Sequence, residues 1–189
     1  IFAFNNGIQN SDDLTRLTSV PLIGVVGVNK SKSYLAVFEK PKSVLSESFR
    51  AIRSSLQFLY KRQNLQGSKT LMITSTIIVG LDLRKPKIFD DFKLTNQIGV
   101  VNYLIGQKTL EEVTNKTQIP FLDVITSGPI PPNPSELIMG ESLKEMMEEL
   151  KKKYDYIILD TPPLGLVTDA LELSNYADVT IYVMRQNVT

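Results

Sequence analysis

Two carboxylates follow apolar, strand-like segments, and they are the side chains best suited to do chemistry. Residues 156–159 are apolar and lead into Asp160, and residues 77–81 are followed by Asp82 and Arg84. An aspartate at the end of a buried strand is well placed to hold Mg²⁺ beside bound phosphates. Each also has a simpler interpretation: Asp160 as a turn former or helix cap, and Asp82 with Arg84 as a surface ion pair.

The residue types that are missing exclude several kinds of chemistry. The 189 residues include no Cys and no His. This excludes disulfides, thiolate nucleophiles, imidazole bases and the usual ligands of zinc, copper or non-haem iron. Carboxylates, Lys, Arg, hydroxyls and backbone amides remain, and they suit phosphate chemistry with an oxygen-bound ion such as Mg²⁺.

The charge balance bears on partners. The 21 basic and 20 acidic side chains give a net charge of +1. There is therefore no overall field that would attract nucleic acid or an anionic membrane, and we predict no nucleic-acid partner. The longest apolar, uncharged stretch has about 12 residues against the roughly 20 that span a bilayer, so no membrane helix is expected.

Two further motifs have both a structural and a functional interpretation. Residues 128–137 form a Pro-rich loop that opens a helix, and helix-start preferences explain this composition without any ligand. Glu47, Arg50 and Arg53 follow one another at steps of three and lie on a helix flank beside the apolar stripe. They form either a solvated ion pair or a row of donors that meets carboxylates of a neighbouring subunit.

The pattern of apolar segments predicts one α/β domain over residues 1–189, with residues 1–20 as a polar linker. Helices alternate with short strands, which indicates a mostly parallel sheet flanked by helices on both faces. The expected helices cover residues 43–63, 99–105, 110–114, 134–153 and 169–175, and the expected strands cover residues 21–26, 70–76, 77–81, 121–126, 156–159 and 179–184.

The junction between two of these strands is physically inconsistent. The strands at 70–76 and 77–81 meet without a turn residue, whereas parallel neighbours need a crossover of about a dozen residues or more. A single strand of about 12 residues would exceed the usual length of ~3–10. We therefore expect a spatial gap between Thr76 and Ile77.

Four motifs together resemble the cytoplasmic kinase domain of the bacterial tyrosine kinases of capsular and exopolysaccharide export, relatives of the MinD/ParA-type P-loop ATPases. The resemblance covers roughly residues 21–189 and implies a three-layer, Rossmann-like P-loop NTPase fold. The motifs are Glu47-x-x-Arg50-x-x-Arg53, Asp82-Leu-Arg-Lys-Pro86, the Pro-rich segment 128–137, and Ile157-Ile-Leu-Asp160-Thr-Pro-Pro163.

The sequence departs from this family in three places. Gly80 stands where the family has the first of two aspartates. The Gly-rich phosphate loop, which in the family follows the position of Thr74 and Ser75, is absent. We infer that roughly 20–30 residues, a loop with its crossover helix, belong between Thr76 and Ile77. The family's Tyr-rich tail is also absent.

The resemblance implies ATP-dependent phosphorylation of protein tyrosines, chiefly the C-terminal Tyr cluster of a neighbouring copy, and regulation of polysaccharide synthesis and export. Asp160 and Asp82 would hold Mg²⁺, and Asp82 would orient the ion or accept the tyrosine proton. Arg84 would steady the phosphates or the edge of the site, and Thr74 and Ser75 would border the nucleotide.

The resemblance also implies partners. The Glu47/Arg50/Arg53 helix would join copies into a ring-like homo-oligomer at the cytoplasmic face of the bacterial inner membrane. Its own membrane-spanning N-terminal part or a transmembrane activator, and a tyrosine phosphatase, would be further partners. Two alternatives are a MinD/ParA-like ATPase switch and a non-catalytic assembly module of the export machinery.

Overall fold

The computed structural model describes residues 11–29, 35–61, 75–163 and 169–184. The chain divides into two compact units, one of residues 1–69 with 181–189 and one of residues 70–180. The second unit contains the sheet and both candidate catalytic carboxylates.

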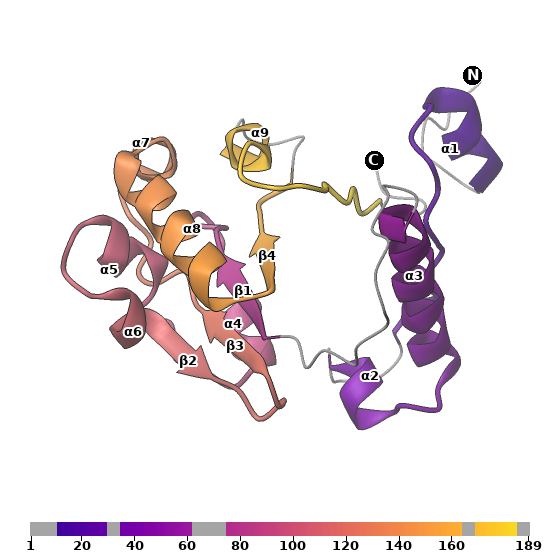
Figure 1. The fold of residues 1–189 in the computed structure, drawn as a ribbon, viewed down its shortest axis with the longest axis horizontal. Coiled ribbons are helices and arrows are strands. Elements are labelled where there is room, and N and C mark those ends of the chain that lie inside the picture. The colour runs from indigo at the N-terminus through magenta and orange to yellow at the C-terminus, as the bar shows by residue number, and fades with distance from the viewer. Residues whose placement is uncertain (1–10, 30–34, 62–74, 164–168, 185–189) are drawn as a thin grey trace, which may run out of the picture. The chain divides into compact units, whose positions relative to one another are not determined.

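A four-stranded sheet in the order β2-β3-β1-β4 forms the centre of the second unit (Figure 1). β1 (Thr76–Gly80) pairs in parallel with β3 (Leu122–Ile125) on one side and with β4 (Tyr156–Asp160) on the other. β2 (Thr114–Lys116) is antiparallel to β3 and was not predicted. The predicted α/β fold with a mostly parallel sheet is confirmed.

Six helices are described in this unit, and most were predicted. The helices expected at residues 99–105, 110–114 and 169–175 are confirmed, whereas the one expected at residues 134–153 is two helices. Gly140 interrupts it with an extended backbone (φ −75°, ψ 154°) and begins the second helix. The helices are α4 (Ile88–Asp91), α5 (Val100–Leu104), α6 (Leu110–Val113), α7 (Pro134–Ile138), α8 (Glu141–Lys153) and α9 (Asp169–Ser174).

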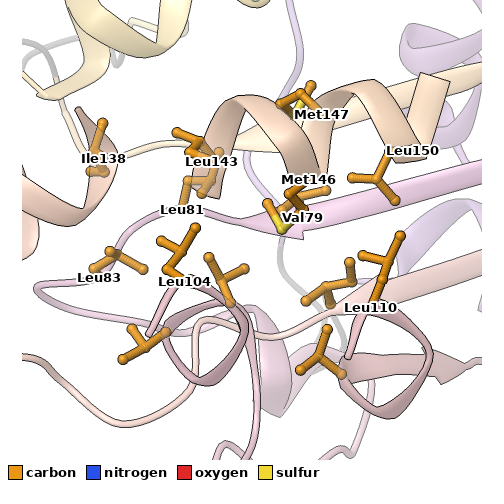
Figure 2. Packing of buried hydrophobic residues seen from close by; sticks show 14 of the residues in the cluster. Val79, Leu81, Leu83, Leu104, Leu110, Ile138, Leu143, Met146, Met147 and Leu150 are labelled. Atoms are coloured by element: carbon orange, nitrogen blue, oxygen red, sulfur yellow. The ribbon is translucent and has the colours of Figure 1, made fainter. Parts of the chain in front are cut away.

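The core lies between one face of the sheet and helices α5, α6 and α8. Alternate residues of the β1 segment point to this face, and the inward stripe of α8 covers them (Figure 2). Each fully buried aliphatic side chain contributes about 1.5–3 kcal/mol. On the other face Tyr156 and Ile158 remain 53% and 51% exposed. The buried residues at the centre of the core are Ile77, Val79, Leu81, Leu143, Met146 and Leu150.

The first unit contains α1 (Ser11–Leu17), α2 (Ala36–Glu39) and α3 (Val44–Lys61). The long helix predicted at residues 43–63 is confirmed in α3, and so is its N-cap. The backbone N–H of Ser46 donates to Ser43 Oγ at 3.1 Å, which satisfies one of the free donors of the first turn. In the described part of the chain, no helix combines the length and the apolar character needed to cross a bilayer.

Two predicted strands are wrong. Residues 21–26 and 179–184 are described as irregular backbone that belongs to no sheet. Val25 is 69% exposed and Val183 is 92% exposed. Apolar and β-branched content favours an extended backbone, but a strand also needs a neighbour that completes its hydrogen bonds. Most of the strand predicted at residues 70–76 lies outside the described residues.

The expected gap at the strand junction is also wrong. Thr76 and Ile77 are consecutive residues of β1, and they pair with Leu122 and Asp123. Because β1 begins at Thr76 as a single strand of five residues, no second described strand has to be joined to it here. The prediction that a phosphate loop belongs at this point concerns residues that this sequence does not contain, and it stays a prediction.

Candidate functional site

The parallel pairing of β1 and β4 brings Asp82 and Asp160 to one edge of the sheet. Asp160 is the last residue of β4 and lies opposite Gly80, the last residue of β1. The backbone N–H of Leu81 donates to the carbonyl oxygen of Asp160 at 2.8 Å, so the pairing extends to the start of the Asp82 turn. The prediction that both carboxylates lie at the carboxyl ends of neighbouring strands is confirmed.

The electrostatics of this edge favour a cation. Burial raises the pKa of Asp160 above its ordinary value, and the nearby carboxylates of Asp82 and Asp91 raise it further. Asp91 comes from α4, and burial together with its neighbour Asp90 raises its own pKa. Asp91 was not predicted as a site residue, although the Asp90-Asp91 pair follows the Asp82 motif closely in the sequence. A bound cation would relieve the repulsion among these carboxylates.

The donor set fits a hydrated Mg²⁺. This ion commonly keeps several waters and binds through one or two carboxylates together with substrate phosphates. Asp82 and Asp160 supply two carboxylates, and the raised pKa of Asp160 shows that its negative charge is poorly compensated by the protein. Among the described residues, no group of three or more acidic side chains is arranged to enclose an ion. Two carboxylates would leave the other coordination positions of such an ion to water and to phosphate oxygens.

A tight turn fixes the carboxylate of Asp82. Its Oδ1 accepts hydrogen bonds from the backbone N–H groups of Arg84 at 3.2 Å and Lys85 at 2.9 Å. An aspartate that bonds the backbone two and three residues further on forms a turn without help from neighbouring strands. The orientation of Asp82 therefore depends on where Arg84 and Lys85 are held.

Arg84 lies at the same edge, but its guanidinium is engaged by other residues. Its Nε donates to Asp169 Oδ2 at 3.0 Å, and its Nη2 donates to Ser135 Oγ at 2.7 Å. Of the two roles that the family resemblance implied for Arg84, steadying the edge of the site is the one that agrees with these contacts, and it stays a prediction. Ser135 and Asp169 were not singled out in the sequence as residues of the site.

The Pro-rich segment is what brings Ser135 to this edge. Gly128 at its start has φ +82°, a backbone conformation that favours glycine. The side chain of Asn96 accepts from the Gly128 N–H at 2.9 Å and donates to the Gly128 carbonyl at 2.7 Å. Pro134 then begins α7, whose second residue is Ser135. The motif that composition alone could not connect to function thus contributes a side chain beside Arg84.

Gly80, which the resemblance places where the family has an aspartate, has close neighbours. A Cβ atom added there would lie 2.9 Å from Ser127 Oγ, 3.1 Å from Ser127 N and 3.2 Å from Ile88 Cγ2. The Ser127 hydroxyl is buried and has no hydrogen-bond partner among the described residues. A side chain at residue 80 would therefore require Ser127 and Ile88 to shift.

We predict that Gly80→Ala destabilises the domain by about 1–3 kcal/mol, because overpacking a filled site costs that much. Urea denaturation of both proteins would measure the change. Gly27→Ala is the matched control, since a Cβ added at Gly27 meets nothing within 4 Å. It should change stability by less than about 0.5 kcal/mol. Equal stability of the two variants would contradict the crowding at Gly80.

Ser75, the one predicted nucleotide-edge residue that the structure describes, is not brought to this site. Ser75 lies just before β1, where its N–H donates to Asp155 Oδ2 at 2.8 Å and its carbonyl oxygen accepts from the Tyr156 N–H at 3.2 Å. The five residues of β1 separate it from the edge that carries Asp82 by about 16 Å, at a rise of about 3.3 Å per residue. Thr74 lies outside the described residues.

The three predicted assembly residues lie on α3. Arg50 donates through Nη1 to Glu47 Oε1 and through Nη2 to the carbonyl oxygen of Pro41. Both arms of this guanidinium are therefore used within the same unit. Arg53, one turn further along, is exposed and makes no described hydrogen bond or ion pair. Of the two guanidinium groups, the one of Arg53 therefore has more donors available for a neighbouring subunit.

Comparison with known proteins identifies the family. Residues 66–186 match the family model described as an AAA domain. The tyrosine-protein kinase YwqD of Bacillus subtilis is 33% identical over 187 aligned positions, which cover 86% of this chain and 77% of that protein. The tyrosine-protein kinase CpsD of Streptococcus agalactiae serotype III is 34% identical over 157 positions, which cover 72% of this chain and 68% of that protein.

Solved structures agree with the sequence relatives. The chimerical protein CapA2B2 superimposes with a TM-score of 0.76 at 31% identity, over 88% of this chain and 81% of that chain. The BceF tyrosine kinase domain superimposes with a TM-score of 0.75 at 26% identity, over 91% and 84%. With the fold, the paired carboxylates and these relatives in agreement, the chain belongs to the family of bacterial tyrosine-protein kinases.

Proposed function

We propose that the gene product, with a phosphate loop at the Thr76–Ile77 position, is an ATP-dependent protein-tyrosine kinase. The observation that carries this proposal, in a chain of this family, is the position of Asp160 at the end of β4 and of Asp82 two residues past the end of β1, its parallel neighbour. The carboxyl edge of parallel strands is where α/β proteins bind their ligands. Phosphoryl transfer requires positioning and charge neutralisation, and carboxylates that bind Mg²⁺ supply both.

The side chains at this edge have separate roles. Asp160, half-buried and with a raised pKa, would hold Mg²⁺ through water. Asp82, held by the turn at Arg84 and Lys85, would orient the ion or accept the proton of the attacking tyrosine hydroxyl. The ion, when bound, neutralises the charge of the β- and γ-phosphates.

The lengths of the alignments support a missing phosphate loop. The YwqD alignment has 187 positions, whereas 86% of the 189 residues is about 163, so about 24 positions have no counterpart in this chain. For CpsD, 157 positions against about 136 residues leave about 21 without a counterpart. A phosphate loop with its crossover helix has about this length. Both relatives thus favour a segment that this chain lacks.

The partners follow from the same proposal. We propose that copies assemble through the α3 flank of Glu47, Arg50 and Arg53 and phosphorylate one another's C-terminal tyrosines. A membrane-spanning part or a transmembrane activator would hold this assembly at the cytoplasmic face of the inner membrane. A tyrosine phosphatase would reverse the modification, and polysaccharide synthesis and export would be the regulated process.

The absence of a phosphate loop from this sequence favours a second candidate function, a non-catalytic assembly module. A third candidate with the same fold is an ATPase switch. Mass spectrometry of the intact gene product after incubation with ATP and Mg²⁺ separates the three. Phosphotyrosine supports the kinase, ADP without phosphotyrosine supports the switch, and neither supports the assembly module. The gene sequence across the codons for Thr76 and Ile77 is the cheapest complementary observation.

The different contacts of Arg50 and Arg53 give a prediction about assembly. Arg53→Ala should weaken self-association and leave the melting temperature nearly unchanged, because an exposed arginine contributes under about 1 kcal/mol to folding. Losing one side of a desolvated contact between subunits costs on the order of 2–5 kcal/mol. Sedimentation velocity and thermal melting of both proteins would measure the two effects.

Arg50→Ala is the informative comparison, because Arg50 also bonds Pro41 and Glu47 within α3 and its approach. It should lower the melting temperature more than Arg53→Ala does. Unchanged sedimentation of the Arg53→Ala protein would contradict a role of this arginine in the ring.

A further inference from the structure

We propose that Asp169 is a positioning residue: through Arg84 it holds the turn that orients Asp82. The inference rests on the proposed function, because it concerns the same carboxylate edge. It assigns a role to a buried side chain that neither the apolar pattern nor the family motifs explain.

Three side chains from distant parts of the sequence form a closed set of hydrogen bonds. Asp169, only 2% exposed, accepts from Arg84 Nε through Oδ2 at 3.0 Å and from Ser135 Oγ through Oδ1 at 2.7 Å. Arg84 Nη2 closes the set by donating to Ser135 Oγ at 2.7 Å. Each oxygen of the buried carboxylate thus has its own donor, as a buried charge requires.

These three hydrogen bonds connect separate segments of the chain around the site. Arg84 follows β1, Ser135 lies in the first turn of α7, and Asp169 is the first residue of α9. Asp160 ends β4, nine residues before Asp169. Asp169 thus follows one candidate metal ligand closely in sequence and contacts Arg84, which lies two residues after the other.

Arg84 links Asp169 to Asp82 because it donates two hydrogen bonds, one from its side chain and one from its backbone. Its side chain donates to Asp169, and its backbone N–H donates to Asp82 Oδ1 at 3.2 Å. The next residue, Lys85, donates to the same oxygen at 2.9 Å. When the guanidinium is held, the peptide groups that face Asp82 have little freedom to turn away. Loss of Asp169 would release the guanidinium first and the Asp82 turn with it.

Because Arg84 and Asp169 are unequally buried, we expect replacement of one to damage the fold more than replacement of the other. Arg84 is 41% exposed and Asp169 only 2%. If Asp169 is replaced, the guanidinium can turn to water, so the fold survives and the turn loosens. If Arg84 is replaced, Asp169 stays as an uncompensated buried charge, which is the more damaging loss. Asp169→Asn is therefore the better probe.

Asp123 provides a matched control elsewhere in the same unit. It is 6% exposed and accepts from one cation, Lys116 Nζ at 2.7 Å, and from one hydroxyl, Tyr154 OH at 2.7 Å. Its burial and its partners are thus similar in kind to those of Asp169. It lies in β3 and has no described bond to the Asp82 turn, so Asp123→Asn reports what the loss of any such carboxylate does.

The test measures the turn and the ion separately. Amide hydrogen exchange resolved by NMR should show the N–H groups of Arg84 and Lys85 exchanging at least about tenfold faster in Asp169→Asn than in wild type. Binding of Mn²⁺ alone, followed by electron paramagnetic resonance, should weaken by about 10–100-fold, the usual effect of losing a group that orients a ligand. Asp123→Asn should change neither quantity.

Each outcome decides the proposal. Unchanged exchange at Arg84 and Lys85 in Asp169→Asn, or equal acceleration in Asp123→Asn, would overturn it. If Asp169→Asn does not fold, Ser135→Ala removes two of the three bonds without stranding a charge, and it should accelerate the same two amides to a smaller extent; no acceleration there would also overturn the proposal. If wild type itself binds no Mn²⁺, the metal site of the proposed function fails, while the exchange comparison still decides the role of Asp169.

Discussion

Insertion of a Gly-rich phosphate loop and its helix between Thr76 and Ile77 is expected to raise tyrosine phosphorylation by at least about a thousandfold over the chain as it stands. The loop would add the backbone N–H groups and the lysine that hold the β- and γ-phosphates, and preorganised charge of this kind is a large part of phosphoryl-transfer catalysis. The chain already carries the carboxylate edge, formed by Asp82 and Asp160, that would hold the ion. With the crossover helix in place, residues 70–76 would form their own strand beside β1, so that the loop after Thr76 would reach this edge. Phosphotyrosine formed from radiolabelled ATP on an added Tyr-rich peptide measures the gain.

A Gly-rich phosphate loop with its crossover helix, taken from a relative such as YwqD and about 24 residues long to match the alignment positions without a counterpart, would serve as the insert. The same insert with its loop lysine changed to alanine is the matched control, since it restores the length, the helix and the backbone N–H groups without the lysine's contact to the phosphates. It should recover folding and little phosphorylation. Equal phosphorylation by the chain with and without the insert would contradict the assignment of the nucleotide site.

The edge of the sheet was predictable because its causes are local. Apolar runs that end in a carboxylate mark strand ends, and parallel pairing of such strands brings their ends together. Asp82 and Asp160 follow from these two rules. The N-cap at Ser43 was predictable for the same reason, since the donors that it satisfies lie within the next turn.

The remaining features depend on partners far apart in the sequence. The role of Asp169 requires Arg84, 85 residues earlier, and Ser135, 34 residues earlier. Residues 179–184 have strand composition but belong to no described sheet, because composition does not supply a neighbour. The break at Gly140 was missed because the Leu and Met pattern continues across it, although glycine is a common helix boundary.

Replacement of Asp160 by Asn is expected to abolish phosphorylation and, at the same time, to stabilise the metal-free domain at neutral pH. In the chain that carries the phosphate loop, losing this ion-holding carboxylate should reduce phosphorylation by at least about a hundredfold, equivalent to about 2.7 kcal/mol. Burial and the neighbouring Asp82 and Asp91 raise the pKa of Asp160, so the folded domain disfavours its charged form. Asparagine removes that charge at almost unchanged volume.

The sign of the stability effect follows from linkage. With a folded pKa above the unfolded one, the ionisation penalty is absent below the unfolded pKa of about 4, grows as pH rises through the folded pKa and is complete above it. The advantage of Asp160→Asn should therefore be present at pH 7 and vanish below about pH 4. Urea denaturation at both pH values, with and without Mg²⁺, measures it. Mg²⁺ should stabilise wild type more than the variant, because only wild type retains both ligands.

Asp155→Asn is the control for removing a carboxylate from the same strand region. Asp155 accepts the Ser75 N–H just before β4, at the opposite edge of the sheet, so the variant should keep phosphorylation within about twofold. If Asp160→Asn gains stability at pH 7 but still phosphorylates tyrosine, the carboxylate of Asp160 is not the one that holds the ion. Loss of both phosphorylation and stability at pH 7 would instead indicate that ionised Asp160 stabilises the fold. Only the combination of higher stability, lost phosphorylation and a lost response to Mg²⁺ fits a carboxylate whose unfavourable charge is compensated by the bound ion.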